Sequence, residues 1–334
     1  MKISLKLILS LLLCGLIIPV IVISCKKEDN PIKFIYGTFP DSIINLEGIN
    51  SANDDYNTEI YQILGGISVV FSSNRQSSGG QFDFVQGKID YTFNQTSGAF
   101  DVQSEITNDS FISKLLAKAN TSKNDFGPYR FFSTVDGFEY MIYSSENESG
   151  NLDFFYLKNS PVLGVSIPEI KGPYPLSLLN TSANDAYISF DSNLDSIYFS
   201  SDRTGNFDIF LDTIDLNNTI SYQFDLAFRE SVPVTSLNSE GNDKCPYFHK
   251  GILIFASDRL GGLGGYDLYY SVLKNKKWSS PVNFGPGINT ASNEYRPVLG
   301  SVQDFNNYFL IFSSDRPGGK DGYDLYLTGF NPIK

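Results

Sequence analysis

Aspartate and arginine side chains recur at fixed spacing in this chain, and they are the first candidates for chemistry. Three similar blocks carry them, YFSSDRTGNFDIFL, IFASDRLGGLGGYDLYYS and IFSSDRPGGKDGYDLYLT, and two looser copies precede these, VFSSNRQSSGGQFDFV and IYSSENESGNLDFFYL. The recurring residues are Asp202, Asp258 and Asp315, then Arg75, Arg203, Arg259 and Arg316, then Asp83, Asp153, Asp208, Asp267 and Asp324. An upstream marker precedes each block, at Asn53-Asp54, Asn124-Asp125, Asn184-Asp185, Asn242-Asp243 and Asn293-Glu294.

Because a catalytic residue is needed once, its presence in every repeat favours a structural role. The glycines of the block allow positive φ in a turn, and an aspartate can accept hydrogen bonds from turn amides. Arg259 and Asp267 flank that turn, so we predict that a bidentate ion pair between them locks the loop. Calcium is the less favoured alternative, since the spacing of Asp315, Asp321 and Asp324 does not match an EF-hand loop. We therefore expect no cofactor.

Acids outside the repeats are the candidates for a carboxylate enzyme. A glycoside hydrolase uses a pair of such groups, one as acid and the other as base or nucleophile. The sequence does not indicate which of them converge. The candidates are Asp101, Glu105, Glu139, Glu169, Glu230 and Asp304.

Histidine and cysteine are too scarce for most imidazole or thiol chemistry. His249 is the only histidine and lies in a strand-like segment, and no Gly-x-Ser-x-Gly elbow is present, which disfavours a Ser-His-Asp triad and a multi-histidine zinc site. Cys14 and Cys25 lie in the N-terminal segment, so Cys245 has no disulfide partner in the folded part. We expect Cys245 to be a small buried hydrophobic residue.

The repeats are built from short strands. Residues 198–201 and 207–210 are rich in aromatic and β-branched side chains and flank a Gly-containing turn, which predicts a β-hairpin. Residues 187–190 supply a neighbouring strand, and segments such as 278–284 supply a fourth. The later arginines recur every 56 or 57 residues, a period that suits four-stranded units with long loops.

One segment departs from this pattern. The gap between Asp83 and Asp153 is longer than the others, and residues 94–122 lie within it. Apolar side chains of residues 111–119 fall on one face behind the cap Asp109 and predict a short helix. Since the other repeats lack this segment, it is either the best candidate for a specialised feature or a tolerated insertion.

The SDRxGGxGGYDLY blocks resemble the WD40-like repeats of the TolB-type β-propeller family. The resemblance covers most of residues 51–334 and implies an all-β propeller of four-stranded blades. TolB-type propellers usually have six blades, whereas five repeats are present here, so five blades are favoured and six are the alternative. The expected repeats are about 51–121, 122–181, 182–239, 240–290 and 291–334.

The last repeat lacks its closing strand. It stops at YDLYLTGFNPIK, whereas the repeat before it continues with KKWSSPVNFGPGINTASN. Residues 35–55 resemble the missing piece, so we expect residues 34–50 to complete the last blade and close the ring, which removes unpaired strand edges. The sequence thus predicts one propeller domain over residues 34–334.

The N-terminal segment predicts export. Residues 1–24 contain lysines followed by a long apolar stretch and no acid, as in secretory signals. Val22 to Cys25 resembles the bacterial lipobox, which implies a lipidated Cys25, a tether over residues 25–33 and membrane contact through the lipid; an uncleaved helical anchor is the alternative. Lys26 to Asp29 is similar to export signals of Bacteroidetes-type surface lipoproteins. We expect an outer-membrane lipoprotein that faces the periplasm or the exterior.

Charge and architecture limit the partners. The formal net charge is −12 and becomes −14 without Lys2 and Lys6, so nucleic acid is a poor partner. A rigid propeller displays loops at its two ends, and loops on rigid scaffolds carry recognition. We therefore expect a non-catalytic binding or scaffolding propeller for an envelope protein or surface glycan. The alternative is a glycoside hydrolase that uses carboxylates at the propeller centre.

Overall fold

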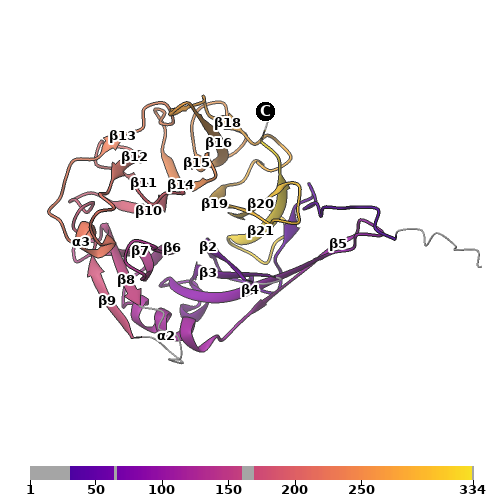
Figure 1. Ribbon diagram of the computed structural model, residues 1–334, viewed down its shortest axis with the longest axis horizontal. Helices are drawn as coiled ribbons and strands as arrows, with labels where there is room; N and C mark the ends of the chain where they lie inside the picture. Colours follow the sequence, from indigo (N-terminus) through magenta and orange to yellow (C-terminus); the bar gives the residue numbers. More distant parts are fainter. Residues whose placement is uncertain (1–30, 64–65, 160–168, 333–334) are drawn as a thin grey trace, which may run out of the picture.

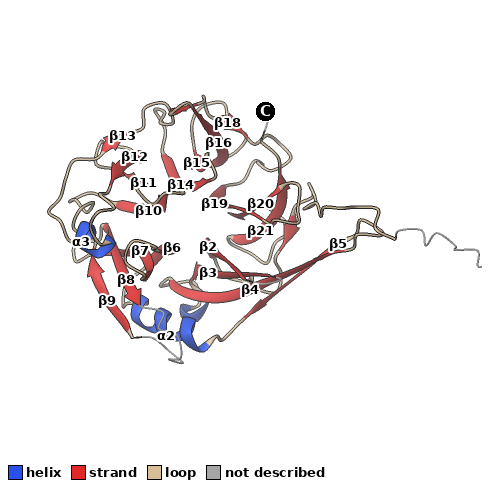
Figure 2. Cartoon of the chain, in the orientation of Figure 1, coloured by secondary structure: helices blue, strands red, loops and turns tan. Residues whose placement is uncertain are grey.

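The computed structural model describes residues 31–63, 66–159 and 169–332, which form five antiparallel sheets arranged around an axis as a five-bladed β-propeller (Figure 1). This confirms the all-β prediction and the favoured blade number. Strands dominate the structure, as Figure 2 shows. Cys25 and the predicted signal lie outside the described residues. Within the described ranges, no helix is long and apolar enough to cross a membrane.

Each blade runs from an inner strand near the axis to an outer strand at the rim (Figure 1). The first blade contains β2 (Asp55–Ile63), β3 (Gly66–Ser73), β4 (Asp83–Phe93) and β5 (Phe100–Ile106). The second contains β6 (Asp125–Phe132), β7 (Glu139–Glu146), β8 (Leu152–Asn159) and β9 (Ile170–Pro175), and the third contains β10 (Asp185–Phe190), β11 (Ser196–Ser201), β12 (Asp208–Thr213) and β13 (Val232–Pro233). The fourth contains β14 (Asp243–His249), β15 (Ile252–Ser257), β16 (Asp267–Lys274) and β18 (Val282–Asn283), with the short β17 (Lys277–Trp278) also paired to β16. The fifth contains β19 (Glu294–Ser301), β20 (Tyr308–Ser314), β21 (Asp324–Phe330) and β1 (Ile44–Asn45).

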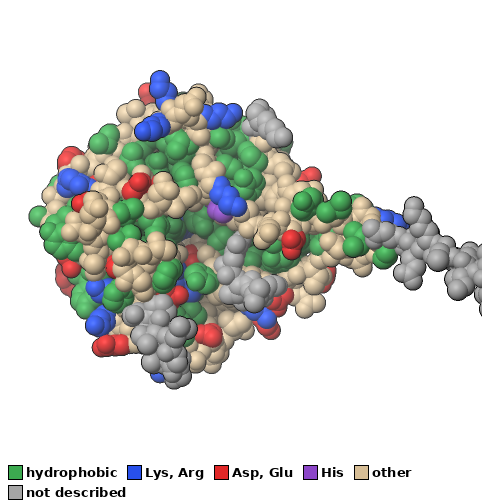
Figure 3. All heavy atoms as spheres, in the orientation of Figure 1, with side chains coloured by type: hydrophobic (Ala, Val, Ile, Leu, Met, Phe, Trp, Pro, Cys, Tyr) green, Lys and Arg blue, Asp and Glu red, His purple; other side chains and the backbone are tan. Residues whose placement is uncertain are grey.

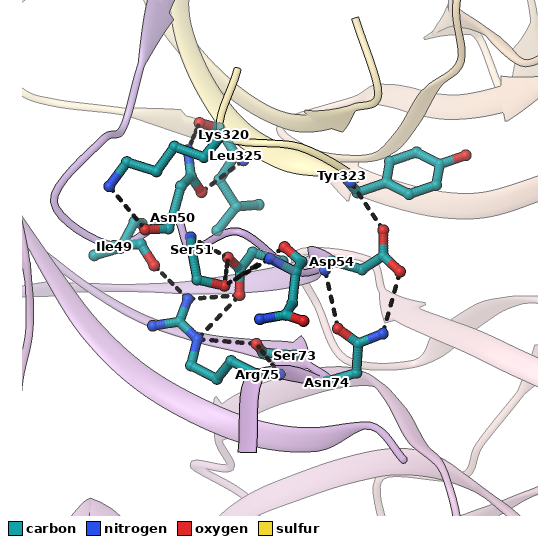
Figure 4. Close-up of polar contacts among 12 residues, drawn as sticks. Ile49, Asn50, Ser51, Asp54, Ser73, Asn74, Arg75, Lys320, Tyr323 and Leu325 are labelled. Atoms are coloured by element: carbon teal, nitrogen blue, oxygen red, sulfur yellow. Dashed lines mark hydrogen bonds and ion pairs between the residues drawn. The ribbon is translucent and has the colours of Figure 1, made fainter. Parts of the chain in front are cut away.

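The N-terminal segment closes the ring, as the sequence predicts. Ile44 pairs with Leu327 in an antiparallel register, so β1 becomes the outer strand of the fifth blade. Farther along, the side-chain amide of Asn50 donates a hydrogen bond to the Leu325 carbonyl and accepts one from the Leu325 backbone amide. Figure 1 shows this indigo segment beside the yellow strands β20 and β21, and Figure 4 shows the contact between Asn50 and Leu325.

Each inner strand carries a bulge at the same place. The register with the second strand shifts after Tyr56, Phe126, Ala186, Lys244 and Tyr295. The next residue has a positive φ in all five strands, and it is Asn57, Gly127, Tyr187, Cys245 or Arg296. A bulge redirects side chains locally, so the five inner strands share the same distortion close to their starts. At Gly127 an added Cβ would lie 2.7 Å from the Tyr187 ring, so only glycine fits between these two blades.

The repeated arginine connects three parts of its blade. Arg259 donates from Nε to Ser257 Oγ at 2.9 Å and from Nη2 to the Leu237 carbonyl at 2.7 Å, and it forms an ion pair with Asp243. Asp243 begins the inner strand and is completely buried. Arg75, Arg203 and Arg316 make the same three contacts, with Asp55, Asp185 and Glu294 as their buried carboxylates.

The predicted ion pair between Arg259 and Asp267 is therefore wrong. Asp267 instead accepts hydrogen bonds from the backbone amides of Leu263 and Gly264, at 2.6 and 3.2 Å, which is the turn-capping role expected of it. Both carboxylates are buried, but Asp267 already accepts from the turn amides and from the Asn283 side chain. The Arg259 guanidinium therefore pairs with Asp243, which would otherwise be a buried charge without a cation. The marker of the first blade also shifts by one position, because Asp55 pairs with Arg75, so the marker is Asp54-Asp55.

Two helices interrupt the strands of the described chain. Helix α2 (Ser110–Ala119) confirms the helix predicted from residues 111–119. Its Asp109 cap accepts hydrogen bonds from two backbone amides, and its apolar face packs against β4, β8 and β9. Helix α3 (Ile220–Phe224) lies between β12 and β13, and a single 3-10 turn, η1 (Arg75–Ser77), follows β3.

Candidate functional site

A cleft of about 560 Å³ opens between the first and second blades, and we call it the inter-blade cleft. Strands from both blades and the first half of α2 line it. Its walls combine aromatic rings with polar side chains, and its volume lies in the range of small-molecule sites. The aromatic residues are Tyr61, Phe111, Phe131 and Tyr140.

Two carboxylates lie on the walls of the inter-blade cleft. Glu139, at the start of β7, accepts a hydrogen bond on Oε2 from Asn159 at 2.9 Å. Asp109, at the start of α2, accepts on Oδ1 from the backbone amides of Phe111 and Ile112 at 2.9 and 3.0 Å. In each carboxylate, therefore, one oxygen is anchored and the other meets no hydrogen-bond donor among the described residues.

Charged groups next to these carboxylates extend toward the axis. Arg130 lines the cleft, forms an ion pair with Glu59 and has its guanidinium 5.2 Å from the centre of the Tyr61 ring. Burial raises the pKa of Glu59 despite the nearby charges of Arg130 and Arg296. Burial also raises the pKa of Tyr61, and the charge of Glu139 adds to this. The Tyr61 hydroxyl thus stays protonated and able to donate a hydrogen bond.

A second hollow of about 260 Å³ lies where the inner strands begin, and we call it the axial pocket. Among the described residues, the one carboxylate on its wall is that of Asp54, whose two oxygens accept hydrogen bonds from the Tyr323 amide and the Asn74 side chain (Figure 4). Five tyrosines and one phenylalanine form the rest of its wall. The inter-blade cleft lies toward the other end of the inner strands, since Tyr61 and Arg130 are near the ends of β2 and β6.

The six acids proposed from the sequence do not converge. Glu139 alone among them lines the inter-blade cleft. The others are exposed on β5, beside β9 or in loops, and they are Asp101, Glu105, Glu169, Glu230 and Asp304. Figure 3 shows one face of the molecule, where hydrophobic side chains surround a central hollow and acidic ones lie mostly toward the periphery.

His249 and Cys245 occupy packed positions. The His249 ring packs edge-on against Tyr308, with Nε2 3.1 Å from Ser301 Oγ, and burial lowers its pKa to about 4. Cys245 is fully buried, as expected, and burial raises its pKa to about 11. Over the described ranges, no three histidine, cysteine or acidic side chains cluster in a way that could hold a metal ion.

Sequence reasoning missed three charged residues on the inner strands. Glu59, Arg130 and Arg296 are buried or nearly so, and each stands where the other inner strands have uncharged residues. Arg296 donates to the Pro128 carbonyl at 3.2 Å across the axis. An alignment of the five inner strands would have revealed all three as departures from the repeat.

Several solved structures of glycoside hydrolases share the fold of this chain. No protein-family model matches the chain, and no curated protein matches it. An exo-β-1,3-galactanase from Phanerochaete chrysosporium superposes with a TM-score of 0.52 at 14% identity, over 87% of this chain and 64% of that one. A thermostable family-43 glycoside hydrolase has a TM-score of 0.50 at 12% identity, over 83% of this chain and 93% of that one. A GH62 α-L-arabinofuranosidase from Coprinopsis cinerea has a TM-score of 0.50 at 14% identity, over 89% and 98%. At these identities the likeness establishes a shared fold.

The expectation of a non-catalytic binding or scaffolding propeller is corrected by this comparison. That expectation was based on architecture, because a rigid ring of blades with exposed loops is typical of recognition modules. Solved structures with the same architecture are glycoside hydrolases. The architecture therefore gives no preference for binding over catalysis, and the expectation of a non-catalytic propeller is withdrawn.

Proposed function

We propose that this protein is a glycoside hydrolase and that its reaction takes place in the inter-blade cleft. The observation that carries the proposal is the pair Glu139 and Asp109, one from the second blade and one from the cap of α2, on the walls of one ligand-sized cleft. The cleft's aromatic rings suit the apolar faces of sugar rings, and its amides and cations suit their hydroxyl groups. The hydrolases that share the fold support this assignment by analogy of architecture alone.

The surroundings of the two carboxylates suggest different roles. Asp109 lies at the N-terminus of α2 with two backbone amides on one oxygen, an arrangement that favours negative charge. We assign it as the base or nucleophile. Glu139, held by Asn159, is then the acid that protonates the oxygen of the leaving sugar. Arg130 and Tyr61 lie beside them to orient the substrate.

The test compares Glu139→Gln with Glu105→Gln. Both substitutions remove one charge and keep the side-chain shape, but Glu105 is exposed and does not line the cleft. Hydrolysis of aryl glycosides and polysaccharides by Glu139→Gln should fall by about 100-fold or more, with an unchanged melting temperature. Full activity in Glu139→Gln, or an equal loss in Glu105→Gln, would remove Glu139 from the mechanism.

We also infer that the chain is exported and anchored through a lipid on Cys25. The lipobox-like run from Val22 to Cys25 and the likeness of the repeats to TolB-type propellers support an envelope location. Envelope or surface glycans are then the expected substrates. The variant Cys25→Ala should leave the detergent phase on cell fractionation, whereas retention there would indicate a helical anchor.

A further inference from the structure

Aromatic rings form the wall of the axial pocket, and most neighbouring pairs are inclined to each other, although Tyr56 and Tyr323 stack at 24°. Tyr56 lies 5.1 Å from Phe82 at 76°, and Tyr266 lies 5.2 Å from Tyr295 at 71°, measured between ring centroids and planes. Such rings enclose a volume on several sides, whereas sugar binding favours one flat exposed face. At about 260 Å³ the pocket is smaller than most drug-sized sites, so its ligand is small.

The only carboxylate of this wall comes from an exchange of residue types in the first blade. In the third blade, Asn184 donates to Asp202 and accepts from the Leu152 amide. In the first blade the same contacts are made with the types reversed, because Asp54 takes the place of the asparagine and Asn74 the place of the aspartate.

The other blades follow the arrangement of the third, with Asn124, Asn242 and Asn293 facing Glu146, Asp258 and Asp315. The exchange therefore keeps the hydrogen bonds and the charge of the unit. It moves the negative charge from the position that Asp202 has in the third blade to Asp54, on the wall of the axial pocket.

Further negative charge surrounds the same rings. Burial raises the pKa of Tyr323 and Tyr266, and the charges of Asp315 and Asp258 add to the effect in the respective rings. The tyrosines are thus neutral, and the charged side chain on the pocket wall is the carboxylate of Asp54, while the guanidinium of Arg296 lies behind the wall, 5.5 Å from the centre of the Tyr187 ring. A wall whose own charge is negative attracts cations.

The aromatic wall already holds one ammonium group of the protein itself. Lys244 Nζ lies 3.9 Å from the centre of the Phe207 ring and 5.6 Å from that of Tyr266, which also lines the pocket. Aromatic faces stabilise ammonium groups in this way through their negative quadrupole. Lys244 thus places an ammonium group against the rings at this end of the axis, although burial lowers its pKa, and the charges of Asp258 and Asp202 act in the opposite direction.

We propose that the axial pocket binds a small organic ammonium ion, with the aromatic rings as a cage and Asp54 as the counter-charge. Methylated ammonium groups fit best, since they are bulky and weakly hydrated and interact with several ring faces at once. This site lies apart from the inter-blade cleft and adds a ligand that hydrolysis of a neutral glycan would not require.

Calorimetric titration of the purified chain with choline tests the proposal. The control ligand is 3,3-dimethyl-1-butanol, the neutral carbon isostere of choline. Choline should bind and the alcohol should bind at least about tenfold more weakly. Vesicles of phosphatidylcholine, run in parallel, distinguish a lipid headgroup from a dissolved ligand. Equal binding of the two isosteres, or no binding of choline in either form, would overturn the proposal.

The matched variant is the double exchange Asp54→Asn with Asn74→Asp, which gives the first blade the arrangement of the others. It preserves net charge and the hydrogen-bond pattern, so the melting temperature should change little, while choline affinity falls about tenfold or more. Lys244→Gln should raise the affinity, because it removes a competing cation from the Tyr266 ring. An unchanged affinity in the double exchange, or a neutral monosaccharide that binds in place of choline, would contradict the assignment of the ligand.

Discussion

At the residue scale, the structure is organised by buried carboxylates at the start of each inner strand. Each of these carboxylates contacts an arginine in the hairpin between the second and third strands of its own blade. The carboxylates are those of Asp55, Asp185, Asp243 and Glu294. A buried charge left without its partner is strongly destabilising. The repeated arginine is thus explained by charge pairing inside its own blade. A catalytic role is therefore sought among residues outside the repeats.

A double-mutant cycle tests the pairing of Arg259. Arg259→Ala should destabilise the fold by about 3–5 kcal/mol, because it leaves Asp243 buried and unpaired. The double variant with Asp243→Ala should cost less than the sum of the two single changes. Lys171→Ala is the control, since its pair with Glu169 is exposed and 3.9 Å long, and should change stability little. Denaturant unfolding provides the free energies of unfolding for the cycle. Coupling of Arg259 to Asp267 in place of Asp243 would contradict the structure.

The second blade lacks the arginine, and this predicts a pH dependence. Burial raises the pKa of Asp125 to about 7. The folded protein therefore holds a proton there that the unfolded chain has lost above about pH 4, so stability falls as the pH rises from about 4 to 7. Replacing Asn147 by Arg and Tyr143 by Phe, the residues found in the third blade, should pair Asp125 and reduce this fall.

The measurement is the free energy of unfolding at pH 5 and pH 8. The double variant should gain stability at pH 8 relative to pH 5, by on the order of 1–3 kcal/mol against the parent. Tyr143→Phe alone is the control, because it removes a buried hydroxyl without adding a cation. A pH profile that is the same in all three proteins would show that Asp125 does not titrate in this range.

At the element scale, local patterns in the sequence predicted the strands and the helix but not the site. The hairpin of β11 and β12 and the helix α2 follow from side-chain periodicity and turn residues, which act over a few positions. The partner of Arg259 could not be predicted, because Asp243, Asp258 and Asp267 all lie near it in the sequence and only the packing of the blade decides between them. The sequence makes Glu139 a candidate as an acid outside the repeats, whereas the position of Asp109 before an apolar helix face indicates only a cap.

The two roles of Asp109 can be separated by substitution. Serine also caps helices, so Asp109→Ser should keep α2 folded and change stability by less than about 1 kcal/mol, whereas Asp109→Ala should lose about 1 kcal/mol. Both should lose hydrolytic activity, because both lack the carboxylate. Melting temperatures and glycoside assays on the two variants separate the effects. An active Asp109→Ser protein would show that Asp109 is a cap alone.

At the scale of the whole molecule, ring closure joins the two ends of the chain. Phe39 is completely buried and its ring stacks on Phe305 at 4.2 Å, and β1 covers the edge of β21. A chain that begins after residue 50 should lose these contacts, expose two strand edges and aggregate or melt many degrees lower. A chain that begins at residue 36 keeps Phe39 and β1 and should melt close to the parent. Equal stability of the two truncations would contradict closure by this route.

The sequence predicted the global arrangement better than the chemistry. Five repeats and a displaced closing strand define a closed five-bladed ring, since each strand must find a neighbour. The inter-blade cleft exists only where the insertion with α2 meets the second blade, and no local pattern marks that contact. No local pattern marks the axial pocket either, because its aromatic side chains come from four blades and are brought together only when the propeller closes.

The central claim is hydrolysis of a glycosidic bond in the inter-blade cleft, and the release of reducing ends from a panel of polysaccharides tests it most directly. The purified chain should release sugars from at least one neutral polysaccharide, and the double variant Glu139→Gln with Asp109→Ser should release none above the uncatalysed rate while melting at the same temperature. Absence of release from the whole panel by the parent, or the same release by the double variant, would contradict the account.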